Sequence, residues 1–187
     1  VDDGTMSEST RAAILQRITD DDPEAAHALL SAAEPSLSRE ALAEWRQRVA
    51  WSYFIENRDA DARALALRTA DGSGSWVAEG EWTAGLAAWR LSDCEAAGGA
   101  FERAAFAAIN PELRTAALYW AARAALRCRR PQDADRLLGE AAGNDDTLYG
   151  MLAAEQLGRA LPDRVENPGF SAADLQRLGT VGNVRVA

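Results

Sequence analysis

The chain has 187 residues, of which 48% are apolar and 26% are charged, and its net charge is −9. This composition is typical of a folded globular chain and argues against intrinsic disorder. The acidic balance also argues against nucleic-acid binding, because the single dense basic run, residues 127–130, is explained by a helix C-terminus. No stretch approaches the roughly 20 consecutive apolar residues of a membrane span, and residues 1–4 do not resemble a signal peptide.

Helix start signals recur along the chain. Residues 22–24 (Asp-Pro-Glu) supply a cap, a proline at the first helical position and an acid in the first turn, and residues 110–112 (Asn-Pro-Glu) repeat this pattern. Ser92 followed by Glu95 is typical of a capping box. No segment alternates apolar and polar residues as a strand does, so the sequence predicts an all-α chain. The predicted helices are 7–19, 23–33, 38–56, 59–70, 75–90, 93–108, 111–128, 131–142, 146–157 and 171–178.

A weak internal repeat indicates how these helices are organised. Asp61-Ala62, Glu95-Ala96 and Asp133-Ala134 each fall early in the second helix of a predicted pair, at separations of 34 and 38 residues. A helical hairpin every ~34 residues is the tetratricopeptide-like period, although the consensus of that family is poorly met. Stacked hairpins bury a continuous core. The sequence therefore predicts an α-superhelix, or solenoid, of helical hairpins without a sheet.

The two cysteines, Cys94 and Cys128, allow two interpretations. They can be buried free thiols, because cysteine packs as a small apolar residue. They can also form a disulfide, since Cys94 is expected to begin one second helix and Cys128 to end the next first helix, on the same edge of a solenoid. A disulfide would be consistent with an oxidising compartment such as the periplasm.

Residues for other site chemistry are poorly grouped. His27, the single histidine, has only Glu24 as an acid at helical spacing, so we interpret it as a half-exposed helix residue. Residues 20–22 lack the spaced ligands and glycine of a calcium loop, and Gly72 and Gly74 lack the Lys-Ser/Thr ending of a phosphate loop. The sequence predicts no metal site, no cofactor and no catalytic residue within this chain.

Aromatic side chains are the remaining candidates for ligand contact. Trp76 and Trp82 lie beside the glycine-containing linker in a segment of mixed polarity, and these two are the candidates for stacking on a glycan. The other tryptophans are expected in the core, which is the usual place of a large aromatic side chain in packed helices. They are Trp45, Trp51, Trp89 and Trp120.

Three stretches resemble the helical superhelix of soluble lytic transglycosylases. The first is Trp82 to Arg90 followed by Asp93 and Phe101-Glu102. The second, Tyr119-Trp120-Ala121-Ala122-Arg123-Ala124, is similar to the family's Tyr-Trp-x-Ala-Arg-Ala. The third, residues 148–158, is similar to Tyr-Gly-x-Leu-Ala-Ala-Glu-x-Leu-Gly. The motif residues, to which we assign structural roles, are Tyr119, Trp120, Arg123, Tyr149, Gly150, Glu155 and Gly158.

The resemblance covers about residues 75–187, so we divide the chain there. Residues 1–74 are expected to form N-terminal hairpins of the superhelix, and residues 75–187 the superhelical region that precedes a catalytic domain. In the family, a lysozyme-like domain cleaves the bond between N-acetylmuramic acid and N-acetylglucosamine. One glutamate acts as acid and then as base while the muramoyl 6-hydroxyl closes a 1,6-anhydro ring.

This chain has no matching Glu-Ser pair followed by Gly-Leu-Met-Gln, so no catalytic residue is carried over. The resemblance implies a catalytic domain beyond Ala187, a periplasmic location, and peptidoglycan as the substrate of the parent enzyme. The chain itself is expected to be a non-catalytic scaffold. The alternative is a stand-alone helical-repeat module that binds a protein partner, because solenoids present concave surfaces for this purpose.

Overall fold

The computed structural model describes residues 4–160, 169, 171–178 and 180. These residues form α-helices and two short 3-10 helices, and no strand occurs among them. The elements in chain order are α1 (Glu8–Thr19), α2 (Pro23–Ala33), η1 (Glu34–Ser36), α3 (Arg39–Ile55), α4 (Asp59–Leu67), η2 (Arg68–Asp71), α5 (Trp76–Arg90), α6 (Cys94–Ala107), α7 (Pro111–Arg127), α8 (Pro131–Ala141), α9 (Leu148–Gln156) and α10 (Ala172–Leu178).

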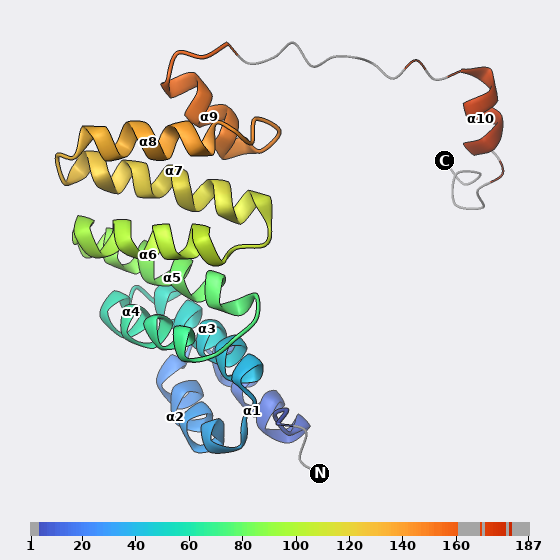
Figure 1. Cartoon of the computed structure of the whole chain (residues 1–187). Helices are drawn as coiled ribbons and strands as arrows, with labels where there is room; N and C mark the ends of the chain where they lie inside the picture. Colours follow the sequence, from blue (N-terminus) through green and yellow to red (C-terminus); the bar gives the residue numbers. More distant parts are fainter. Residues whose placement is uncertain (1–3, 161–168, 170, 179, 181–187) are drawn as a thin grey trace.

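Helices α1 to α9 stack in chain order, each packing mainly on its neighbours along the chain (Figure 1). In addition α5 packs on α3, and α9 packs on α7. The predicted all-α fold is confirmed, and the succession of packed helices is compatible with a superhelix. The predicted boundary after residue 74 falls between η2 and α5, and α5 packs on α3 and α4 across it.

Local capping explains why most of these helices begin where the sequence predicts. The Asp22 carboxylate accepts a hydrogen bond from the backbone N–H of Ala25 at 3.1 Å, at the start of α2. The Asn110 side chain accepts from the N–H of Glu112 at 2.8 Å, at the start of α7. Each bond satisfies a backbone donor that has no partner within its helix.

The capping box predicted from Ser92 and Glu95 is wrong. The cap of α6 is Asp93, whose carboxylate accepts from the N–H of Ala96 at 3.0 Å. Ser92 has a φ of 64°, in the left-handed region, and belongs to the turn between α5 and α6. Its backbone is therefore not in the extended conformation from which a cap side chain reaches the first turn.

Four turns share one conformation: those joining α1 to α2, α3 to α4, α5 to α6, and α7 to α8. In each, a residue with φ between 56° and 64° precedes the N-cap residue, whose N–H donates to the carbonyl five positions earlier at 2.8–3.0 Å. The positive-φ residues, spaced 35 to 37 apart, are Asp21, Asn57, Ser92 and Arg129. We call the four helix pairs hairpins one to four, and the recurring turn shows that they are structural repeats.

Each second helix also carries a fully buried alanine four residues after its cap. These alanines are Ala26, Ala62, Ala97 and Ala134, each 0% exposed. A methyl side chain lets the second helix approach the first closely without a cavity. The repeat predicted from the sequence agrees at Ala62 and Ala134. Its register is one residue wrong in α6, because the equivalent position is Ala97 and not Ala96.

Ion pairs between hairpins follow the same repeat. Arg58, the N-cap residue of α4, pairs with Glu24 of the preceding hairpin and with Asp61 of its own helix, the latter at 2.7 Å. Arg130, the N-cap residue of α8, makes the equivalent pairs with Glu95 at 3.1 Å and Asp133 at 3.4 Å. Exposed pairs of this kind contribute little to stability. Their recurrence shows that consecutive hairpins meet in a similar way.

Candidate functional site

A groove of about 360 Å³ lies where α5, α7 and the end of α9 meet. It is lined by Trp89, Tyr119, Arg123, Leu126 and Gln156. The three residues from α7 are spaced by four and three positions, so they share one face of that helix. Trp89 comes from the last turn of α5, and Gln156 is the last residue of α9. The groove thus combines an apolar wall, one amide and one cationic side chain.

Aromatic contacts join the three helices that form the groove. The ring centroids of Tyr119 and Tyr149 are 5.3 Å apart, which places α9 against α7. Trp120 meets Trp89 edge to face, at 5.4 Å between centroids. Trp120 also packs near Phe101, and its indole nitrogen is buried with no hydrogen-bond partner within the described part of the chain. Such ring pairs stabilise a junction by more than their buried area alone.

Two arginines of α7 lie over these rings. The guanidinium carbon of Arg123 is 5.0 Å from the ring centroid of Trp120 and 5.9 Å from that of Trp89. The guanidinium of Arg127 lies 4.9 Å from the Trp89 ring, and it donates to the Ser92 hydroxyl at 2.9 Å. A guanidinium stacked on a ring keeps its N–H edge free for a carboxylate or another planar anion.

The charge of these two arginines is not balanced within the described residues, where no carboxylate lies within ion-pair distance of either. Arginines on neighbouring helices are paired with acids: they are Arg90 with Asp59, Arg103 with Glu81, Arg130 with Glu95 and Arg136 with Glu102. The groove is therefore a local cationic site in a chain whose net charge is −9.

The structure brings together four of the motif residues predicted from the sequence. They are Tyr119, Trp120 and Arg123 on α7 and Tyr149 on α9. Glu155 is exposed on α9 and does not line the groove. The sequence interpretation placed Trp89 in the core, whereas the structure makes it half-buried and part of the groove wall.

The two motif glycines have backbone roles. A Cβ atom on Gly150 would lie 1.9 Å from the carbonyl oxygen of Asn144, so only glycine permits this close approach at the start of α9. Gly158 has a φ of 68° just after α9, and the next N–H, of Arg159, donates to the Ala154 carbonyl at 2.9 Å. This is the geometry of the recurring hairpin turn. Both glycines therefore hold α9 in place.

The two tryptophans predicted as glycan-stacking candidates lie outside the groove. Trp82 is half-buried and packs on the core residue Phe101, with ring centroids 5.3 Å apart. Trp76 is half-buried, and the guanidinium of Arg48 lies 4.9 Å from its ring centroid. Both rings therefore contact the protein itself, and stacking on a sugar stays a prediction for them.

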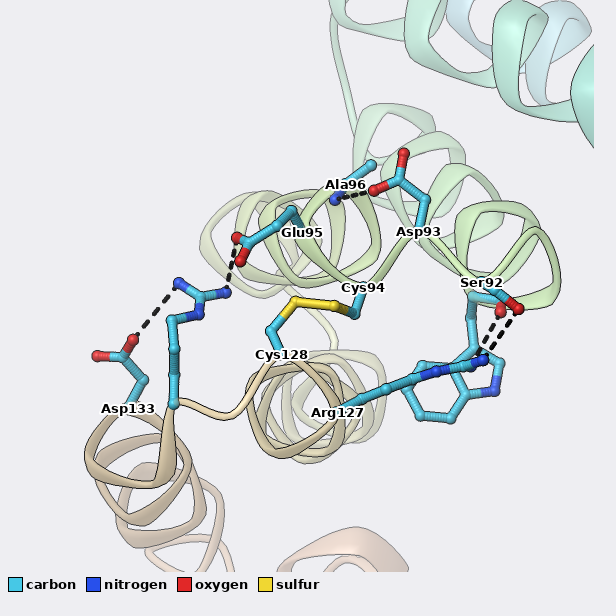
Figure 2. The surroundings of a disulfide bond; sticks show 10 residues. Ser92, Asp93, Cys94, Glu95, Ala96, Arg127, Cys128 and Asp133 are labelled. Atoms are coloured by element: carbon cyan, nitrogen blue, oxygen red, sulfur yellow. Dashed lines mark hydrogen bonds and ion pairs between the residues drawn. A yellow bond between two sulfur atoms is a disulfide. The ribbon is translucent and has the colours of Figure 1, made fainter.

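Cys94 and Cys128 form a disulfide with a Cα–Cα distance of 5.7 Å, so the free-thiol interpretation does not hold in this structure. Cys94 begins α6, and Cys128 follows the last residue of α7 (Figure 2). The bond thus links hairpins three and four at the edge that carries their turns. Arg127, next to Cys128, donates a hydrogen bond to the Ser92 hydroxyl on the same edge.

Other titratable groups lie outside the groove. The Nδ1 atom of His27 is 3.3 Å from the Tyr53 hydroxyl, and burial, followed by the charge of Arg68, lowers the pKa of His27. Burial raises the pKa of the Glu79 carboxyl on α5. The described residues contain no group of three or more His, Cys, Asp or Glu positioned to hold a metal. Within the same residues, no helix has the length and apolar character needed to cross a membrane.

Comparisons with family models, curated proteins and solved structures found no match to this chain. The resemblance to lytic transglycosylases therefore depends on the motif residues alone, of which Tyr119 and Tyr149 are in contact.

Proposed function

We propose that this chain is the non-catalytic superhelical scaffold of a peptidoglycan lytic transglycosylase. The observation that carries the proposal is the contact between the two motif stretches, where Tyr119 of α7 packs on Tyr149 of α9 at 5.3 Å. The two motif stretches therefore form one junction of the helical stack. Their contact at a hairpin junction is what a shared superhelix architecture predicts.

In this proposal the scaffold positions a lysozyme-like domain that cleaves peptidoglycan to 1,6-anhydromuramoyl products. A stack of hairpins, joined by ring contacts and by the Cys94–Cys128 disulfide, is a stiff support for such a domain. The disulfide also supports a periplasmic location, because structural disulfides persist in oxidising compartments. In this proposal the group that cleaves the bond belongs to the lysozyme-like domain.

The test uses the full-length gene product and this chain alone, each incubated with purified peptidoglycan. Mass spectrometry of the released fragments distinguishes 1,6-anhydro products from hydrolysed ones by the mass of one water. We expect anhydro products from the full-length protein and none from residues 1–187. A full-length protein that releases no anhydro product, or a reading frame that ends without a lysozyme-like sequence, would overturn the proposal.

A helical-repeat interaction module is the second candidate, and one surface favours it. Phe106, in the last turn of α6, and Ile109, in the connection to α7, are 92% and 84% exposed. Phe106 borders a cavity of about 340 Å³ whose other apolar walls include Leu118 and Leu137. Large exposed apolar side chains beside a cavity are typical of protein-binding surfaces. Site-specific cross-linking from position 106 tests this role, with exposed Leu15 on α1 as the control position.

A further inference from the structure

We infer that the groove between α5, α7 and α9 binds the free carboxylate of a short peptide, with Arg123 as the anion-binding residue. The identity of the ligand depends on the proposed function: within it, the ligand is the peptide stem of peptidoglycan. The groove is then a substrate-holding site on the scaffold, separate from the chemistry of bond cleavage.

The first argument is charge. Arg123 is exposed, it lines the groove, and within the described chain it faces no carboxylate. The nearest arginine along the helix, Arg127, has no acid partner among the described residues and is instead held by the Ser92 hydroxyl and the Trp89 carbonyl. Two uncompensated guanidinium groups one helical turn apart attract an anion, and the attraction is strongest for a ligand partly removed from water.

The second argument is preorganisation. The rings of Trp120 and Trp89 lie beneath the guanidinium of Arg123, which limits the rotamers available to this long side chain. A side chain that is already ordered loses less conformational entropy when a ligand binds. A guanidinium also carries two parallel N–H groups along one edge, the geometry that matches a carboxylate.

The third argument separates a peptide from a sugar. A pyranose ring binds to an open aromatic face, but in this groove the guanidinium of Arg127 lies over the Trp89 ring, and the Tyr119 ring packs on Tyr149. The remaining lining residues suit a peptide. Leu126 is 44% exposed and offers an apolar contact, and the side-chain amide of Gln156 has both donors and an acceptor for a peptide bond.

The experiment is calorimetric titration of the oxidised chain with a disaccharide–tetrapeptide prepared from peptidoglycan. Two matched ligands accompany it: the same disaccharide without the peptide, and the same muropeptide with its carboxylates amidated. We expect binding of the unmodified muropeptide only, weakened by added salt because surface charges are screened. Arg123→Gln should reduce the affinity at least about tenfold, as expected for the loss of a charge-assisted hydrogen bond.

Arg11→Gln is the matched control, because Arg11 is an exposed helical arginine on α1, outside the groove. It should leave the affinity unchanged, and both variants should keep the wild-type thermal midpoint. Equal binding of the disaccharide without peptide, or equal affinity of the two variants, would overturn the inference. Equal affinity for an unrelated acidic tetrapeptide would overturn the assignment to peptidoglycan stems.

The two proposals fail separately. If the full-length protein releases anhydro products but Arg123→Gln binds muropeptide with normal affinity, the peptide-binding role of the groove is disproved and the scaffold function stands. If the chain binds muropeptide through Arg123 but the full-length protein releases no anhydro product, the scaffold function is disproved.

Discussion

The carboxylate of Glu81 on α5 is buried and accepts two hydrogen bonds, each 2.9 Å long, from the guanidinium of Arg103 on α6. This pair fastens the two helices of the third hairpin. Arg103→Ala would leave a buried carboxylate without its partner, so we expect a loss of about 2 kcal/mol in the free energy of unfolding. Urea unfolding followed by far-UV circular dichroism measures it.

Arg136→Ala is the matched control, because Arg136 pairs with Glu102 and both side chains are about half exposed. Exposed pairs contribute little, and we expect a loss of about 0.5 kcal/mol or less. If both variants lose the same free energy of unfolding, then the burial of Glu81 does not determine how much its ion pair with Arg103 stabilises the chain.

Reduction of the Cys94–Cys128 disulfide should lower the stability of the chain. The bond closes a loop of sequence separation 34, and constraining such a loop in the unfolded state contributes about 4 kcal/mol. Urea midpoints of the oxidised and the reduced protein measure this difference. The variant Cys94→Ala/Cys128→Ala should match the reduced protein and should not respond to reductant. Equal urea midpoints for the wild-type protein before and after reduction would contradict the prediction.

Gly150→Ala should disturb α9 more than Gly158→Ala does. The added methyl group at position 150 would overlap the carbonyl oxygen of Asn144, so the backbone must move, at a cost of about 3 kcal/mol. At position 158 there is open space, and the cost is the positive φ alone, about 1 kcal/mol. Thermal unfolding of both variants ranks them, and the reverse order would show that α9 is not packed as described.

The stability of the chain should depend on pH through His27. Burial lowers the pKa of its imidazole below 6.5, so the unfolded chain binds this proton more tightly than the folded chain does. The stabilisation linked to His27 is therefore complete above pH 6.5 and is lost as the pH falls through the pKa of the folded state. Unfolding free energies measured between about pH 7.5 and pH 5 should decline in the wild type.

His27→Gln should flatten this decline, since glutamine does not titrate. Hydrogen bonds from arginine lower the carboxyl pKa values of Glu24 and Glu34. The stabilisation linked to these two carboxylates is therefore lost only below pH 4.5, outside the pH range measured for His27. An NMR titration of the imidazole gives a direct check. A midpoint at or above 6.5, or an unchanged slope in the variant, would refute the assignment.

Helix limits were predictable where they depend on adjacent residues. Asp22 and Asn110 bond to backbone groups within three positions, so their roles can be recognised in the sequence. The choice between Ser92 and Asp93 as the cap of α6 was not predictable in this way. Either side chain can cap a helix, and in the structure Ser92 occupies the left-handed position of the turn while Asp93 caps the helix.

The groove was predictable only in part. Tyr119, Arg123 and Leu126 share a face of one helix, and helical spacing alone places them together. Trp89 and Gln156 come from two other helices, and their positions depend on how each hairpin is rotated on the one before it. A sequence pattern carries no direct record of that rotation. For the same reason the buried pair of Glu81 and Arg103 could not be predicted.

The recurring turn affects how the chain unfolds. Because each hairpin repeats the geometry of its neighbour, its contacts run mainly to the hairpins on either side, and stability is approximately a sum of local terms. Such an array frays from its ends instead of melting at once. The disulfide links hairpins three and four covalently, whereas hairpins one and two have no such link within the described residues. Amide hydrogen exchange should therefore be fastest in α1 and α9, at the two ends of the stack, and slowest around the disulfide, which makes the junction of hairpins three and four the most stable part of the array.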